Sequence, residues 1–223
     1  MGTQLLIIVL ILIIPVCASI YCQSTYNKYK RIKTEKEKTG FEVAREILDK
    51  NGLKDVHIVE TSGVMSDHYD PRRKVVRLSH EVFHGSTIAS ISIAAHEVGH
   101  AIQDKEKYLY MRIRAFIFPI VNIASYFAYI LIIISFILSS VNLLWLSIIL
   151  MSFGVIFQLV TLPVEFNASN RAGKQLKALK QFSQKELNGS KSMLTSAALT
   201  YVAGLVASLL ELLRLVLIAR GND

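Results

Sequence analysis

Four long apolar stretches alternate with polar ones along this chain of 223 residues. The first occupies residues 5–20, the second and third occupy 116–138 and 143–162, and the fourth occupies 194–218. A helix needs about 20 mostly apolar residues to cross the hydrocarbon core of a bilayer. The pattern therefore predicts four transmembrane helices in a multi-pass membrane protein that is mainly α-helical.

The longest polar region, residues 23–112, has a mixed α and β pattern. A short amphipathic helix is expected at 41–51, and a strand is expected at 56–61. Residues 64–78 suit a β-hairpin, because Asp70-Pro71 interrupts the apolar pattern before the strand at 75–78. That second hairpin strand could offer an edge on which an extended peptide pairs.

A long helix should follow the hairpin. Ser86 is the expected N-cap, and the helix should continue through His96 and His100 to about Glu106. Together with the short helix and the strands, it makes a small α+β domain.

The formal net charge is +8, and lysine and arginine cluster beside the apolar stretches. Lys28, Lys30 and Arg31 follow the first stretch, and no positive side chain precedes it, so its C-terminal end should face the cytoplasm. The segment 164–191 is also basic, whereas the short loop 139–142 carries no charge. The soluble region and the 164–191 segment should therefore share the cytoplasmic face. No nucleic-acid recognition motif accompanies the charge, so the expected partner is the lipid bilayer and not nucleic acid.

These patterns predict an order of segments along the chain, with three parts in the membrane and two at its cytoplasmic surface. The segments are an anchor at 1–22, a cytoplasmic α+β region at 23–112, a transmembrane hairpin at 113–163, a cytoplasmic helix at 164–192, a transmembrane helix at 193–219 and a tail at 220–223.

A metal-binding motif lies in the predicted long helix. His96-Glu97-Val98-Gly99-His100 has the pattern HExxH, and side chains at i and i+4 share one face of a helix, so both imidazoles can bind one ion. Glu97 stands where it can hold a water on that ion and take its proton. Burial of these three polar groups without a metal would be costly. Two histidines and a carboxylate suit Zn²⁺.

The same pattern occurs a second time, in His80-Glu81-Val82-Phe83-His84. Gly85 follows this motif at once and Ser79 can cap its other end, so its helix has little more than one turn. The motif at 96–100 has a long helix around it and small neighbours that let other groups approach. We therefore expect the metal at the second motif, and we expect His80 and His84 to be polar residues on the surface of their short helix.

Zinc needs a third protein ligand, and three carboxylates are candidates. Asp104 lies on the same helix face as His100 but is too close in sequence to complete a tetrahedron, so it is expected to hold a ligand in place. Glu211 is expected to pair with Arg214. Glu165 is the best candidate, because the two spans before it cross the membrane and return to the side on which His100 lies.

Three separate stretches of the chain resemble the YugP-like bacterial family of membrane-bound neutral zinc metallopeptidases. They are Ser-Asp-His-Tyr-Asp-Pro-Arg at 66–72, Ala-Ala-His-Glu-Val-Gly-His-Ala-Ile-Gln at 94–103 and Leu-Pro-Val-Glu-Phe-Asn-Ala-Ser at 162–169. More distantly, the chain resembles HtpX-type and CAAX-prenyl-protease-type membrane peptidases, which carry HExxH and a later ExxxD. In this chain Ser169 stands in place of that aspartate. The resemblance implies peptidase activity but no particular substrate.

The expected function is that of a zincin-like, gluzincin-like endopeptidase at the cytoplasmic membrane surface, acting on peptides or membrane proteins. Glu97 would be the general base, and His68 or Tyr69 could donate a hydrogen bond to the oxyanion. Two alternatives stay open. One is a zinc-stabilised scaffold without activity. The other is a site-2-type intramembrane protease, which would need HExxH inside a span, whereas the apolar stretch at 88–102 is too short to cross.

Overall fold

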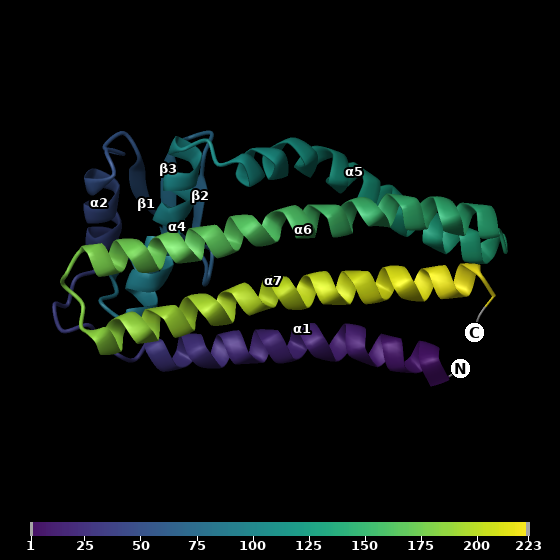
Figure 1. Ribbon diagram of the computed structural model, residues 1–223, viewed down its shortest axis with the longest axis horizontal. Helices are drawn as coiled ribbons and strands as arrows, with labels where there is room; N and C mark the ends of the chain where they lie inside the picture. The colour runs from purple at the N-terminus through teal and green to yellow at the C-terminus, as the bar shows by residue number, and fades with distance from the viewer. Residues whose placement is uncertain (1, 222–223) are drawn as a thin grey trace. The chain divides into compact units, whose positions relative to one another are not determined.

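A computed structural model describes residues 2–221 of the chain (Figure 1). The chain divides into two compact units. One contains residues 2–19, 109–163 and 199–221, and the other contains 20–108 and 164–198. Each unit is built from segments that are far apart in sequence.

The first unit consists of apolar helical segments. Within residues 2–221, four helices are long and apolar enough to cross a membrane, and they lie where the four spans are predicted: α1 (Gly2–Tyr29), α5 (Leu109–Ile137), α6 (Val141–Ala178) and α7 (Gln184–Ala219). Glu211 and Arg214 form a bidentate pair at 2.8 and 2.6 Å, so the expected role of Glu211 is also confirmed.

Two helix boundaries differ from the prediction. The third apolar stretch and the basic segment after it belong to one continuous helix, because α6 passes through Pro163 without a break. The break falls later, at Lys180, whose positive φ of 54° cannot continue a helix. The predicted cytoplasmic helix at 164–192 is therefore the end of α6 and the beginning of α7, joined by a short turn.

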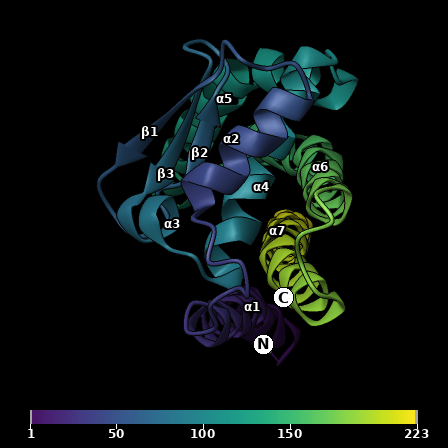
Figure 2. The same cartoon turned by 90° about the vertical axis from the view of Figure 1, so that its left-hand side faces the viewer.

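The second unit contains a small sheet and three helices of its own. Its elements are α2 (Gly40–Lys50), β1 (His57–Thr61), β2 (His68–Asp70), β3 (Val75–Ser79), α3 (His80–His84) and α4 (Ile88–Lys105). The predicted short helix, strand and hairpin are confirmed. β3 pairs with β2 in the antiparallel sense and with β1 in the parallel sense, as Figures 1 and 2 show.

The predicted edge at β3 is wrong. In the described part of the chain the strand order is β1-β3-β2, so β3 is the central strand and both of its edges are paired. The error arose because the parallel partner β1 precedes the hairpin in sequence, and nothing in the local pattern shows that it inserts beside β3. An extended peptide cannot pair with this strand.

The core of the second unit lies between α2, the sheet and α4. The apolar face of α2 contributes Val43, Ile47 and Leu48, which are fully buried and pack with Val76 and Leu78 of β3. The start of α2 is fixed by a capping box, in which Thr39 and Glu42 bond each other's backbone N–H groups. This core holds α4, which carries the HExxH motif, against the sheet.

The cap of α4 is Thr87 and not Ser86. The Thr87 hydroxyl accepts a hydrogen bond from the backbone N–H of Ser90, whereas the carbonyl of Ser86 accepts one from the backbone N–H of Thr34. The bridge from Thr34 draws the chain at Ser86 away from the helix, so the helix begins one residue later.

Candidate metal centre

Three side chains from two distant segments converge in the second unit. His96 and His100 lie one turn apart on α4, and Glu165 comes from α6. Glu165 Oε2 lies 3.4 Å from His96 Nε2 and 3.6 Å from His100 Nε2. Glu165 is 3% exposed, so the side chains packed around it hold it in this position. The arrangement matches the one expected from sequence.

The spacing of these atoms suits a zinc ion. Zinc binds nitrogen and oxygen at about 2.0–2.2 Å in a tetrahedron, which puts neighbouring ligand atoms about 3.4 Å apart. The three ligand atoms all lie within 4.8 Å of one another, and the two contacts to Glu165 are close to the ideal spacing.

Hydrogen bonds fix which nitrogen of His100 faces Glu165. Gln103 Nε2 donates to the carbonyl of Val164 at 2.8 Å, and this sets the orientation of the amide. Gln103 Oε1 therefore faces His100 Nδ1 at 3.0 Å and can only accept, so Nδ1 carries the proton. In the neutral ring the lone pair of Nε2 then points at a carboxylate oxygen, and the two groups repel each other. A metal ion between them, or a proton on Nε2, removes this repulsion.

The acidic neighbours of His100 favour a positive charge at this site. Burial disfavours the imidazolium form of His100, but the hydrogen bond to Glu165 and the negative charge of Glu97 outweigh burial and raise the pKa of His100 above its usual value. The site therefore attracts positive charge. A proton and a metal ion compete for it, and acidification should favour the proton.

His96 also has a hydrogen-bond partner, at the position where ExxxD proteins carry the aspartate. Ser169 Oγ lies 3.2 Å from His96 Nδ1, one turn beyond Glu165 on α6. The hydroxyl can accept from Nδ1 and leave Nε2 toward Glu165. A serine thus occupies the position from which an aspartate would hold the ring, without adding negative charge.

The remaining predicted site residues lie in different places. Glu97 is 8% exposed and lies on α4 between the two histidines in sequence. His68 is exposed on β2, with its Nδ1 2.8 Å from the carbonyl of Ser66. The Tyr69 hydroxyl donates a hydrogen bond to Asp104 at 2.9 Å. Among the described residues, Asp104 therefore orients this tyrosine and does not hold a metal ligand in place, contrary to the expectation. A role for His68 at the oxyanion stays a prediction.

Comparison with known proteins decides the family. The family described as "Putative neutral zinc metallopeptidase" matches residues 4–220. The chain belongs to this family. A curated relative from Bacillus subtilis (strain 168), named "Putative membrane protease YugP", is 48% identical over 202 residues, which is 90% of each chain. The resemblance found in the sequence is confirmed. No solved structure matches the chain.

In this member of the zinc metallopeptidase family, a close approach of two helices brings the ligands together. A Cβ added to Gly99 on α4 would stand 2.7 Å from the backbone oxygen of Ala168 on α6. A side chain at this position would push Glu165 away from the histidines. Gly99, the small residue inside the motif, is thus required for the close approach of α6.

We predict that Gly99→Ala destabilises the protein by about 1–3 kcal/mol and weakens metal binding, because overpacking against backbone cannot be relieved by a rotamer change. Thermal unfolding in detergent and zinc affinity would measure both effects. Gly173→Ala on α6 is the matched control, since a Cβ there meets nothing within 4 Å. Equal stability and zinc affinity in the wild type and the Gly99 variant would contradict the prediction.

Sequence reasoning missed Gln103, the fully buried residue that orients His100. It also donates to Asn167 Oδ1 at 2.9 Å, and Arg171 joins Asn167 to Glu106 through bonds of 2.6 Å. This network ties α4 to α6 around the candidate ligands. In the sequence, Gln103 is marked only by its position, one turn after the second histidine and on the same helix face.

We predict that Gln103→Leu lowers zinc affinity about 10–100-fold, the usual effect of removing an outer partner of a metal-ligating histidine. Competition with a chromophoric chelator would measure the affinity. Gln175→Leu, which removes an amide pair with Asn51 between α6 and α2, should leave it unchanged. If both variants bind zinc like the wild type, the orienting role of Gln103 is wrong.

Proposed function

We propose that this protein is a membrane-bound zinc-dependent endopeptidase that cleaves peptide bonds at the cytoplasmic membrane surface. The proposal rests on one observation above all: the donor atoms of His96, His100 and Glu165 lie within 4.8 Å of one another. Glu97 comes from the same helix as the two histidines. Three protein ligands would leave a fourth zinc position for water, as in catalytic zinc sites.

Zinc bound by these ligands would lower the pKa of a water toward neutrality and polarise the scissile carbonyl. Glu97 would take the proton of the attacking water and deliver it to the leaving amine. Gln103 and Ser169 would hold the two imidazoles through Nδ1. Burial of the cluster would keep solvent from screening these charges.

The charge distribution supports the cytoplasmic location. Positive side chains follow the first apolar segment, and α6 continues past Pro163 into a stretch with Arg171, Lys174 and Lys177. Such clusters mark cytoplasmic ends of membrane helices. Since Glu165 lies at the start of this basic stretch, the catalytic group belongs on the same side, in a small zincin-like domain.

A cleft beside the site suits the substrate. It has a volume of ≈ 490 Å³ and is lined by the ends of α6 and α7. Ser169, the partner of His96, forms part of its wall, with lysines at 174, 177 and 191 and leucines at 176, 187 and 194. We infer that it takes apolar and acidic side chains of a polypeptide.

The alternatives have less support. Within residues 2–221, α4 is not among the helices long and apolar enough to cross a membrane, whereas a site-2-type protease would need HExxH inside a span. A scaffold that uses zinc only for stability has no need of an acid beside the first histidine, yet Glu97 is buried there at some cost.

The proposal is tested with purified protein in detergent micelles and a quenched fluorescent casein. Cleavage should stop with a zinc chelator and return when zinc is restored. A scaffold would lose stability on chelation but would show no cleavage at any zinc concentration, and this result would overturn the proposal.

A further inference from the structure

The first HExxH stretch forms a second cluster of metal-binding side chains. Its two histidines lie on α3, and Glu60 from β1 joins them. His80 Nδ1 is 2.6 Å from Glu60 Oε1, and His84 Nε2 is 3.0 Å from Glu60 Oε2. One donor atom from each residue lies within 4.8 Å of the other two. The imidazole centroids are 4.8 Å apart, the same separation as between His96 and His100.

The sheet explains why Glu60 is present. β1 runs parallel to β3, and Glu60 pairs in register with Leu78, two residues before His80. Because α3 follows β3 without a loop, the end of β1 lies beside the first turn of α3. The carboxylate is thus placed by strand pairing and does not depend on a flexible loop.

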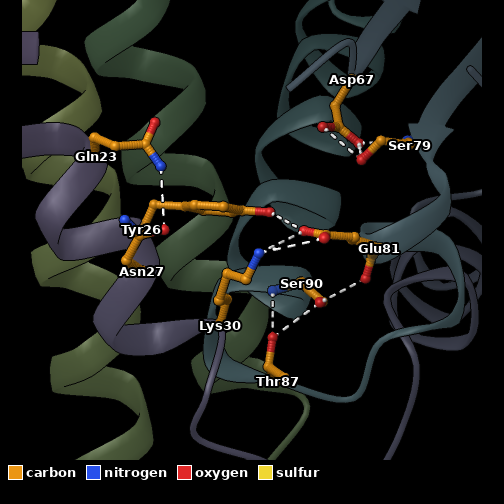
Figure 3. A network of polar contacts seen from close by, with 9 residues as sticks. All are labelled: Gln23, Tyr26, Asn27, Lys30, Asp67, Ser79, Glu81, Thr87 and Ser90. Atoms are coloured by element: carbon orange, nitrogen blue, oxygen red, sulfur yellow. Dashed lines mark hydrogen bonds and ion pairs between the residues drawn. The ribbon is translucent and has the colours of Figure 1, made fainter. Parts of the chain in front are cut away.

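The structure also supplies the rigidity that so short a helix lacks alone. Glu81 accepts hydrogen bonds from Tyr26 Oη on α1 at 2.7 Å and from Lys30 Nζ, just after the end of α1, at 3.2 Å (Figure 3). Its carbonyl accepts one from Ser90 Oγ at 3.1 Å. At the start of α3, Asp67 accepts from the backbone N–H of Ser79 at 2.7 Å. Three separate elements therefore fix the helix that presents the two imidazoles.

The same contacts distinguish this cluster from the proposed catalytic one. Glu81 has the position in its motif that Glu97 has in the other, but its carboxylate is bound by Tyr26 and Lys30. It is not available to take a proton from a water on the cluster. The chemistry left to the cluster is binding.

We propose that Glu60, His80 and His84 form a second, non-catalytic Zn²⁺ site on the surface of the second unit. Two imidazoles and one carboxylate favour zinc over Mg²⁺ or Ca²⁺, which prefer oxygen ligands. The side chains are 42–76% exposed, so an ion bound here would exchange readily with solution. Bound zinc would tie the end of β1 to α3.

The test measures zinc stoichiometry on full-length protein in detergent, stripped with a chelator and dialysed against buffered zinc. Wild-type protein should hold about two ions per chain, one for each cluster. The double variant His80→Gln/His84→Gln should hold about one and keep its casein cleavage. Glu60→Gln, a single exposed change, should lose the same ion if the double variant is unstable. His57→Gln on the same strand is the control and should behave like the wild type.

The double variant His96→Gln/His100→Gln separates this proposal from the proposed function. It should also hold about one ion, and that ion should be lost when His80 and His84 are replaced as well. If the His80/His84 and Glu60 variants bind as much zinc as the wild type, the second site does not exist, whatever the outcome at the other cluster.

Discussion

Glu97→Gln should lower kcat/KM for casein by about 10²–10⁴-fold, the contribution of a positioned general base, while zinc stays bound. Glutamine has nearly the same shape but cannot take the proton of the attacking water. The three proposed ligands are untouched, so metal content measured by mass spectrometry should equal that of the wild type. Cleavage is followed by release of fluorescence at fixed protein and zinc concentrations.

The matched control for this experiment is already present in the sequence. Glu81→Gln changes the equivalent residue of the first motif, whose carboxylate is bound by Tyr26 and Lys30. It should affect the anchoring of α3 but not the rate of catalysis at saturating zinc. Full activity in the Glu97 variant would remove Glu97 from the mechanism. Equal losses in both variants would show that the effect is structural.

Glu165→Ala should strip the metal from the proposed catalytic cluster and abolish cleavage. We expect zinc affinity there to fall at least about 100-fold. Loss of a residue that only hydrogen-bonds a metal ligand costs up to about 100-fold, and here a ligand itself is removed. Affinity is best measured in a His80→Gln/His84→Gln background, so that the other cluster does not contribute. Activity is measured on the same samples.

A second buried glutamate serves as the control for Glu165. Glu186 accepts hydrogen bonds from the backbone N–H groups of Ser183 and Glu35 at 2.6 and 2.8 Å. Glu186→Ala should therefore destabilise the start of α7 but leave zinc bound. Normal zinc content in the Glu165 variant would mean that another carboxylate completes the site.

Local patterns were sufficient for most elements of the second unit. The apolar spacing of 41–51 gave α2, and the interruption at Asp70-Pro71 gave the hairpin. Glu165 is the residue expected beside the histidines, since an even number of crossings would restore the side of the membrane, and the structure places it there. Each of these inferences depends on neighbours in sequence or on counting spans.

Long-range pairing explains what the sequence could not show. The parallel pairing of β1 with β3 buries the supposed edge and brings Glu60 to α3, and no local signal marks it. Gln103 acquires its role only when the carbonyl of Val164 arrives from α6. The displaced cap at Thr87 likewise depends on a bridge from Thr34. In each case the deciding contact comes from a remote segment.

The order of the converging residues along the chain has a consequence for biosynthesis. His96 and His100 are translated before α5 and the apolar part of α6, whereas Glu165 and Ser169 are translated after them. A nascent chain therefore carries an incomplete cluster until α5 and the apolar part of α6 have been made. The proposed hydrolytic activity would accordingly be absent from every shorter nascent chain.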